Sequence, residues 1–144
     1  MRVITYCCSV FCALVSLVTA RADTFDFVIE TQTPNQVFTF RSENSIDLAI
    51  DWGDGATEVA ALTANRSHTY ATPGRYTNKI SGASSRIAFG GFAGTTPLLL
   101  RDILTPLSPA VTNVTSAYQM FQGCTGITQF ACAEWFDEAS KKVA

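Results

Sequence analysis

The alternation of apolar and polar residues at positions 46–52 constrains the fold more than any other feature. Apolar residues occupy every second position from Ile46 to Trp52, and Asp47 and Asp51 stand between them. Successive side chains of a strand point to opposite faces, so the pattern predicts a half-buried antiparallel strand. Gly53-Asp54-Gly55 follows, and because glycine adopts positive φ readily, the chain can reverse there into residues 57–62. The sequence therefore predicts a β-hairpin.

Similar short runs recur from residue 24 to residue 92. Phe25, Phe27 and Ile29 share one face of an extended segment, and the turn signals Thr33-Pro34-Asn35 and Pro73-Gly74 separate later runs. A run at residues 87–89 ends the series. About seven short strands with turns between them are the pattern of a β-sandwich, so we expect a mainly β fold.

The first 22 residues are typical of a secretory signal peptide. Met1-Arg2 precedes an apolar run, and small residues surround a cleavage position after Ala22. A retained membrane anchor is the alternative, because about 18 apolar residues can just span a bilayer. We expect cleavage, a secreted or cell-surface location and no membrane insertion of the mature chain.

The charge of the mature chain argues against nucleic acid as a partner. Removal of residues 1–22 takes out two of the ten basic residues and none of the twelve acidic ones, so the formal charge becomes −4. The only basic cluster left is Lys141-Lys142. Proteins that bind phosphate backbones need a basic patch, and this chain lacks one.

The composition changes after Gly90-Gly91. Leucines separated by prolines replace the aromatic and β-branched residues, and residues 113–122 fit a short helix that Gly123 would end. Ile127 and Phe130 fit buried positions of a strand or coil. We therefore expect a second segment from residue 93 onward.

Three motifs in order resemble a PKD (polycystic kidney disease) domain. They are Trp52-Gly53-Asp54-Gly55, His68-Thr69-Tyr70 and Pro73-Gly74-Arg75-Tyr76. The resemblance implies an immunoglobulin-like β-sandwich over residues 23–92. It also implies structural roles for the motif residues Trp52, Gly53, Asp54, Gly55, His68, Tyr70, Gly74 and Tyr76.

A later stretch resembles one leucine-rich repeat of BspA-like surface proteins. The match runs from Met120-Phe121 through Cys124 to Ile127, and residues 135–143 resemble the start of another unit. The resemblance implies a short leucine-rich-repeat-like α+β segment over residues 93–144. Solenoid repeats need about three neighbours to bury their apolar faces. The segment must pack back onto the sandwich or be truncated or degenerate, and we favour the second reading.

Catalytic and metal sites have little support in the sequence. His68 is the only histidine, and no nucleophile motif accompanies it, so we expect no enzyme activity and interpret His68 as a tie between its strand and the Gly53-Asp54-Gly55 turn. Asp51, Asp54 and Glu58 are the calcium candidates, because Ca²⁺ prefers carboxylate oxygens. Three acids are too few for a complete site, and no cofactor is expected.

Only two cysteines, Cys124 and Cys132, follow residue 22. In an exported chain they most simply form one disulfide, since a zinc site would need more ligands and redox pairs are usually Cys-x-x-Cys. Phe130, Trp135 and Phe136 are candidates for an interaction surface, although an intact repeat array would bury them.

The combined resemblances imply a secreted or cell-surface binding or adhesion protein without catalytic activity. In that interpretation a PKD-like spacer presents a repeat-based surface to a protein or carbohydrate ligand. The alternative is an accessory module, either a spacer or a carbohydrate-binding unit, of an exported hydrolase.

Overall fold

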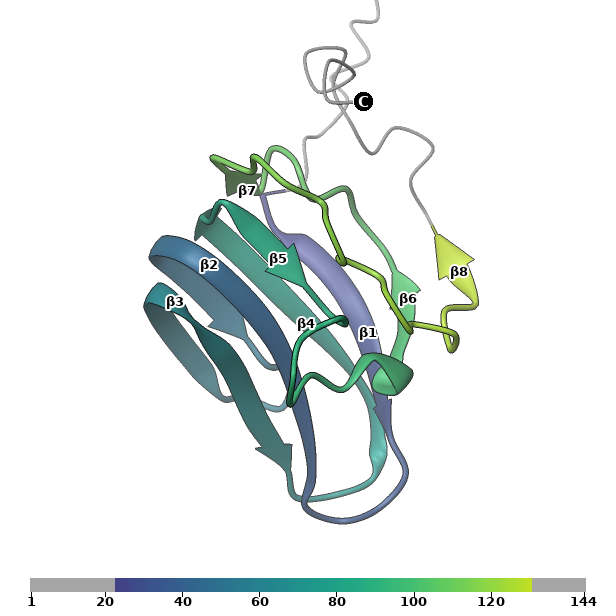
Figure 1. Ribbon diagram of the computed structural model, residues 1–144. Helices are drawn as coiled ribbons and strands as arrows, with labels where there is room; N and C mark the ends of the chain where they lie inside the picture. Colours follow the sequence, from purple (N-terminus) through teal and green to yellow (C-terminus); the bar gives the residue numbers. More distant parts are fainter. Residues whose placement is uncertain (1–22, 131–144) are drawn as a thin grey trace, which may run out of the picture.

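A computed structural model describes residues 23–130, and nearly all of its regular elements are strands (Figure 1). The elements are β1 (Phe25–Thr31), β2 (Gln36–Asp51), β3 (Thr57–Tyr70), β4 (Gly74–Ala83), β5 (Arg86–Ala88), the 3-10 helix η1 (Pro97–Leu99), β6 (Leu100–Ile103), β7 (Val111–Thr112) and β8 (Gln129–Phe130). The fold is mainly β and sandwich-like, which confirms the predicted class at this level. The predicted signal peptide lies outside the described residues, and within residues 23–130 no helix is long and apolar enough to cross a membrane.

The eight strands form one curved sheet that folds around its own interior. The strand order is β3-β2-β4-β1-β6-β8, with β5 paired to β2 and β7 paired to β4. Residues 41–43 of β2 pair with β5, whereas residues 46–51 pair with β4. Because β2 changes partners half-way along its length, the two parts of the sheet face one another as the layers of a sandwich do (Figure 1).

Two bulges bend the hairpin formed by β2 and β3. The register between these strands shifts on both sides of Ser45, and Asn44 and Asp47 have φ values of 47° and 48°. A bulge inserts one unpaired residue and moves the following side chains to the other face. Ile46 is consequently 62% exposed, although the sequence predicts it on the buried face with Leu48. The bulges also let β2 and β3 continue as long strands where the sequence predicts shorter ones.

The strand β3, at one end of the strand order, is irregular at its centre. Leu62 has a φ of 66°, which interrupts the regular strand. Arg66 Nη2 donates to the carbonyl oxygens of Ala61 and Leu62 at 2.6 and 3.1 Å. Arg66 Nε also donates to the Ser42 hydroxyl of β2 at 2.9 Å, so one arginine side chain joins the irregular part of β3 to the neighbouring strand.

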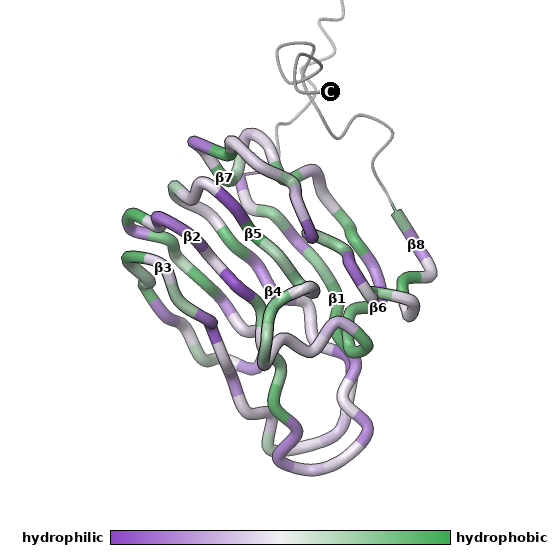
Figure 2. The backbone as a smooth tube through the Cα atoms, in the orientation of Figure 1, coloured by the Kyte–Doolittle hydropathy of each residue, from purple (hydrophilic) through white to green (hydrophobic). Residues whose placement is uncertain are grey.

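A cluster of phenylalanines forms the centre of the core. Phe27 is fully buried, and its ring centroid lies 4.9 Å from that of Phe89 at an interplanar angle of 64°. Phe38 and Phe40 pack beside Phe27 at 6.0 and 6.4 Å. Edge and tilted arrangements of this kind are favoured between aromatic rings. Figure 2 shows how apolar and polar residues alternate along the strands that bury these rings.

The core and the sheet continue past Phe92. The strand β6 pairs antiparallel with β1, while β7 and β8 add parallel pairs to β4 and β6. Leu100 and Ile103 are fully buried in the same cluster as Phe27, and Met120 is 3% exposed. Residues 93–130 therefore pack onto the sandwich, which is the alternative that we favoured less from the sequence.

An ion pair between a buried carboxylate and an exposed arginine joins this later segment to the first strands. Asp102 on β6 is 6% exposed, and its carboxylate accepts a hydrogen bond from Arg75 on β4. The Thr128 hydroxyl donates to the other carboxylate oxygen at 2.7 Å. Asp102 thus links β4, β6 and the residues that lead into β8.

The predicted helix over residues 113–122 is wrong, because this segment forms turns. Asn113 and Gln119 have φ values of 64° and 59°, which interrupt a right-handed helix. The Phe89 amide donates to the Met120 carbonyl at 2.8 Å, so a tertiary hydrogen bond replaces a helical one. Within residues 93–130 the regular helical element is the three-residue η1.

Candidate binding surface

The turn between β2 and β3 is held by the predicted motif residues. His68 Nε2 lies 2.7 Å from Asp54 Oδ2, and the imidazole stacks on Trp52 with centroids 5.1 Å apart. The Tyr70 ring meets the imidazole edge-on, with centroids 4.7 Å apart. His68 therefore ties β3 to the turn, as the sequence predicts. Burial alone raises the pKa of Asp54. The hydrogen bonds from His68 and the Ala56 amide lower the pKa by more than burial raises it, so the pKa lies below its ordinary value.

The hydroxyl of Tyr70 is buried beneath the same turn. It donates to the Trp52 carbonyl at 2.9 Å and lies 2.8 Å from Asn78 Oδ1. The ring of Tyr76 packs 4.3 Å from that of Tyr70, and Gly74 begins β4 beneath them. Burial raises the pKa of Tyr70 well above its ordinary value. This geometry supports a structural role for the motif.

The three calcium candidates do not converge on one point. Asp51 Oδ1 accepts the Gly53 amide at 2.9 Å, and Asp54 is occupied by His68. Glu58 lies 3.7 Å from an Arg66 guanidinium nitrogen. Among residues 23–130 there is no group of three His, Cys, Asp or Glu side chains that could hold a metal ion.

An open hollow of about 670 Å³ lies on the turns that lead from β7 to β8. Residues 117–122 and Phe130 line it, and we call it the aromatic hollow. Tyr118 is 65% exposed and Phe130 is 48% exposed, whereas Met120 is buried beneath them. The ring of Phe121 contacts Phe130 edge-on at 5.3 Å and stacks on the core residue Phe89 at 5.8 Å. The hollow is therefore anchored directly on the core.

Two glycines let the turns of the hollow approach the end of β5. A Cβ atom at Gly90 would collide with the Gln122 carbonyl oxygen, and one at Gly91 would lie 2.7 Å from the Gln119 side chain. Such contacts are closer than a side chain allows. Gly90 and Gly91, after which the composition of the chain changes, thus allow the turns of the hollow to pack against the end of β5.

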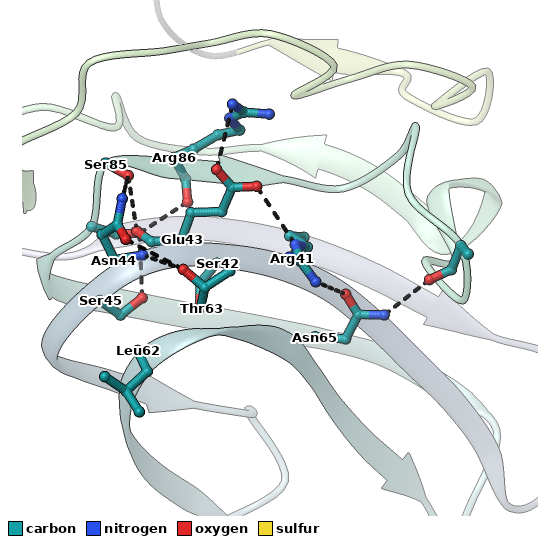
Figure 3. Close-up of polar contacts among 12 residues, drawn as sticks. Arg41, Ser42, Glu43, Asn44, Ser45, Leu62, Thr63, Asn65, Ser85 and Arg86 are labelled. Carbon is teal, nitrogen blue, oxygen red and sulfur yellow. Dashed lines mark hydrogen bonds and ion pairs between the residues drawn. The ribbon is translucent and has the colours of Figure 1, made fainter.

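Two arginines share one carboxylate beside the hollow (Figure 3). Arg41 Nε lies 3.6 Å from Glu43 Oε1, and Arg86 Nη2 lies 3.4 Å from Glu43 Oε2. The guanidinium carbon of Arg86 is 5.8 Å from the centroid of the Tyr118 ring and 5.7 Å from that of Phe92. Both distances are within the range of cation–π attraction. The cluster places a net positive charge at the edge of the aromatic hollow.

These arginines are not saturated with hydrogen bonds. The Nε atoms of Arg41 and Arg86 are buried and have no hydrogen-bond partner. Arg41 also contacts β3: its Nη1 donates to Asn65 Oδ1 at 3.4 Å, and Asn65 Nδ2 donates to the Ala93 carbonyl at 2.9 Å. Sequence reasoning missed this cluster, because β2, β3, β5 and two loops contribute to it and no short motif connects them.

The residues of the predicted repeat motif are all part of the sandwich core or its border. Met120 belongs to the buried cluster, and Phe121, Cys124 and Ile127 pack against it while partly exposed. These contacts join the motif residues to the same core as the strands of residues 25–89.

The predicted disulfide is not tested by the described residues. Cys124 takes part in no disulfide within residues 23–130, and burial raises the pKa of its thiol to about 11. Its predicted partner Cys132 lies outside that range, as do Trp135 and Phe136 of the predicted interaction surface. Only Phe130 of that surface is described, and it lines the hollow.

Comparisons with known proteins assign no family. No family model, curated protein or solved structure matches the chain. The resemblances to PKD domains and BspA-like repeats remain predictions.

Proposed function

We propose that this chain is a secreted or cell-surface binding protein without catalytic activity, whose sandwich-like domain presents the aromatic hollow to a protein or carbohydrate ligand. One observation carries the proposal. The Tyr118 ring is 65% exposed at the hollow, and the Arg86 guanidinium lies 5.8 Å from its centroid.

Exposed aromatic side chains in a concave site are suited to recognition. Tyrosine combines an apolar ring with a polar hydroxyl, and tyrosine and arginine are enriched among residues that contribute most to binding. Gln119 and Gln122 add amide groups that can donate and accept hydrogen bonds. A few polar groups within an apolar hollow are the usual composition of a binding site.

The support beneath the hollow favours binding without large rearrangement. Met120 is buried, Phe121 stacks on Phe89, and Gly90 permits close packing against Gln122. Since ordering a surface reduces affinity, a surface that is already ordered binds more tightly. The predicted PKD-like motif supports a spacer or presenting role for the rest of the domain, and the predicted signal supports export.

Binding of the full chain to a glycan array and to immobilised extracellular-matrix proteins tests this function. The Tyr118→Ala variant should bind at least about tenfold more weakly, which corresponds to about 1.4 kcal/mol. Leu98→Ala is the matched control, because Leu98 is 62% exposed but lies on η1 outside the hollow. Equal binding by the wild type and Tyr118→Ala would contradict the proposal. Tyr118-dependent binding to insoluble structural polysaccharides would instead favour the accessory-module alternative.

A further inference from the structure

Arg41 on β2 and Arg86 on β5 form a pair of cations around one acid (Figure 3). Glu43 lies opposite Arg86 in the register of the two strands and two positions from Arg41, so the three side chains share one face of the sheet. Both arginines contact the carboxylate of Glu43. Because one acid lies between two bases, this arginine pair keeps one positive charge uncompensated.

The arginine pair also keeps most of its hydrogen-bonding capacity. A guanidinium group has several N–H donors and no acceptor. Within residues 23–130, the bond from Arg41 Nη1 to Asn65 Oδ1 is the single hydrogen bond of the two groups, and neither Nε atom has a partner. The contacts with Glu43, at 3.6 and 3.4 Å, are longer than the about 2.7–2.9 Å of a charge-assisted hydrogen bond. The Arg41 and Arg86 side chains are 28% and 22% exposed, so an anion in solvent has access to the pair.

The ring of Phe92 holds the two arginines in place. The guanidinium carbons of Arg41 and Arg86 lie 5.2 and 5.7 Å from its centroid, within the range of cation–π attraction. The Asn65 amide donates to the Ala93 carbonyl at 2.9 Å and fixes the loop that carries this ring. Side chains that are already ordered lose less conformational freedom when a ligand binds. The arginine pair is therefore pre-organised for an oxyanion.

An exposed aromatic ring lies next to the arginine pair. Tyr118 is 65% exposed, and the guanidinium carbon of Arg86 lies 5.8 Å from its centroid. A uronic acid or a sulfated sugar carries its oxyanion on a sugar ring, whose C–H groups can pack on an aromatic face. One such sugar unit can contact Arg86 and Tyr118 together, whereas an acidic peptide needs two residues to do so. This juxtaposition favours a sugar as the source of the oxyanion.

We propose that the arginine pair of Arg41 and Arg86 binds the carboxylate or sulfate group of an acidic glycan. Guanidinium groups match the planar, paired oxygens of a carboxylate and also bind other oxyanions. This inference rests on the proposed binding function and names the class of its ligand. The recognising charge comes from β2 and β5, outside the lining of the aromatic hollow.

Calorimetric titration of the full chain with short acidic glycans tests the proposal. The probes are an oligogalacturonate, which carries carboxylates, and a dextran sulfate oligosaccharide, which carries sulfates. The fully methyl-esterified oligogalacturonate is the control ligand, because it keeps the sugar rings and removes the charge. We expect at least one acidic probe to bind, with an affinity that falls as the salt concentration rises. Binding of neither acidic probe, or binding of the oligogalacturonate no tighter than that of its ester, with no binding of the dextran sulfate, would overturn the proposal.

Three substitutions locate the oxyanion. Arg41→Gln and Arg86→Gln should each weaken binding at least about tenfold, because each removes donors to a charged group. Glu43→Gln should tighten binding several-fold, since glutamine keeps a side-chain oxygen near the arginines and removes the charge that competes with the ligand. Lys79→Gln is the matched control, because the exposed Lys79 pairs with Asp51 at the other end of β2. An equal loss in Lys79→Gln, or weaker binding by Glu43→Gln, would overturn the assignment.

These results separate the class of ligand from the binding function itself. A gain in affinity for Glu43→Gln cannot arise from a failure to fold. Tyr118-dependent binding of neutral glycans or proteins that is indifferent to both arginine substitutions would leave the proposed function intact and overturn this inference. Binding of hexaglutamate as tight as that of the acidic glycans would assign the pair to acidic peptides and also overturn it. Arginine-dependent binding of acidic glycans that is indifferent to Tyr118→Ala would contradict the proposed function and support the arginine site.

Discussion

The hydroxyl of Tyr70 donates a hydrogen bond to the backbone carbonyl of Trp52 at 2.9 Å, across 18 positions of sequence. The bond is buried and joins the last residue of β3 to the residue that follows β2. It holds the two ends of the long hairpin together beneath the turn that carries Asp54. A buried carbonyl that loses its donor keeps its desolvation cost, so this contact matters more to stability than an exposed one.

The Tyr70→Phe substitution should lower the free energy of unfolding by about 1–3 kcal/mol, because the Trp52 carbonyl loses its buried donor. Tyr76→Phe is the matched control. The Tyr76 hydroxyl donates to the Thr72 carbonyl on the exposed side, where water can replace it, so the change should stay within about 0.5 kcal/mol. Denaturant unfolding of both variants measures the difference, and equal losses would contradict the assignment.

The Asp54→Asn substitution should reduce stability near neutral pH and leave it unchanged in acid. A carboxyl whose folded pKa lies below its unfolded value stabilises the fold above the unfolded pKa, and this stability is lost as the pH falls through the folded pKa. The gap between wild type and variant should therefore close below about pH 4. Unfolding titrations at several pH values measure it. A gap of the same size at pH 3 and pH 7 would show that the Asp54 carboxylate has no such role.

The two glycines of the turn should respond differently to alanine. Both have positive φ, at 80° for Gly53 and 97° for Gly55, but a Cβ at Gly53 would also collide with the Thr77 carbonyl oxygen. Gly55→Ala meets no atom within 4 Å, so backbone strain of about 1 kcal/mol is the main cost. Gly53→Ala should cost clearly more, as thermal or denaturant unfolding can measure. A smaller loss for Gly53→Ala would argue against the close packing of the turn on β4.

The strand β6 should be as stable as β1, because Ile103 is fully buried in the common core. We expect Ile103→Ala to cost about 2–5 kcal/mol, whereas Leu104→Ala, at a 36% exposed position, should cost less than about 1 kcal/mol. Hydrogen exchange should show similar protection of amides in β6 and β1. Rapid exchange confined to residues 93–130 would restore the interpretation of this segment as an incomplete repeat.

The predictable part of the fold is its local pattern. Alternation before Trp52 and the positive φ tolerated at Gly53 and Gly55 indicate the hairpin and its turn. The pairing of His68 with the turn also follows from the motif. The predicted burial of Ile46 is wrong, because a bulge at Asp47 shifts the alternation by one residue. No turn residue or other local pattern in the sequence indicates this bulge.

The aromatic hollow could not be predicted, because its parts are separated in sequence. The sequence predicts that Tyr118 lies on one face of a helix over residues 113–122. In the folded chain this segment instead packs against the end of β5, and residues 117–122 line the hollow. Arg86 reaches Tyr118 because Glu43 holds it from the neighbouring strand. These contacts have no periodicity or spacing that a sequence can display.

The mainly β class, the hairpin and its turn follow from short stretches of the sequence, since backbone preference and the period of apolar residues act over a few positions. Two features appear only in the folded chain: residues 93–130 share the core with β1, and a hollow opens beside Arg86. The reason is physical: burial of Leu100, Ile103 and Met120 against the sandwich outweighs their local preferences, and that gain exists only when distant segments meet.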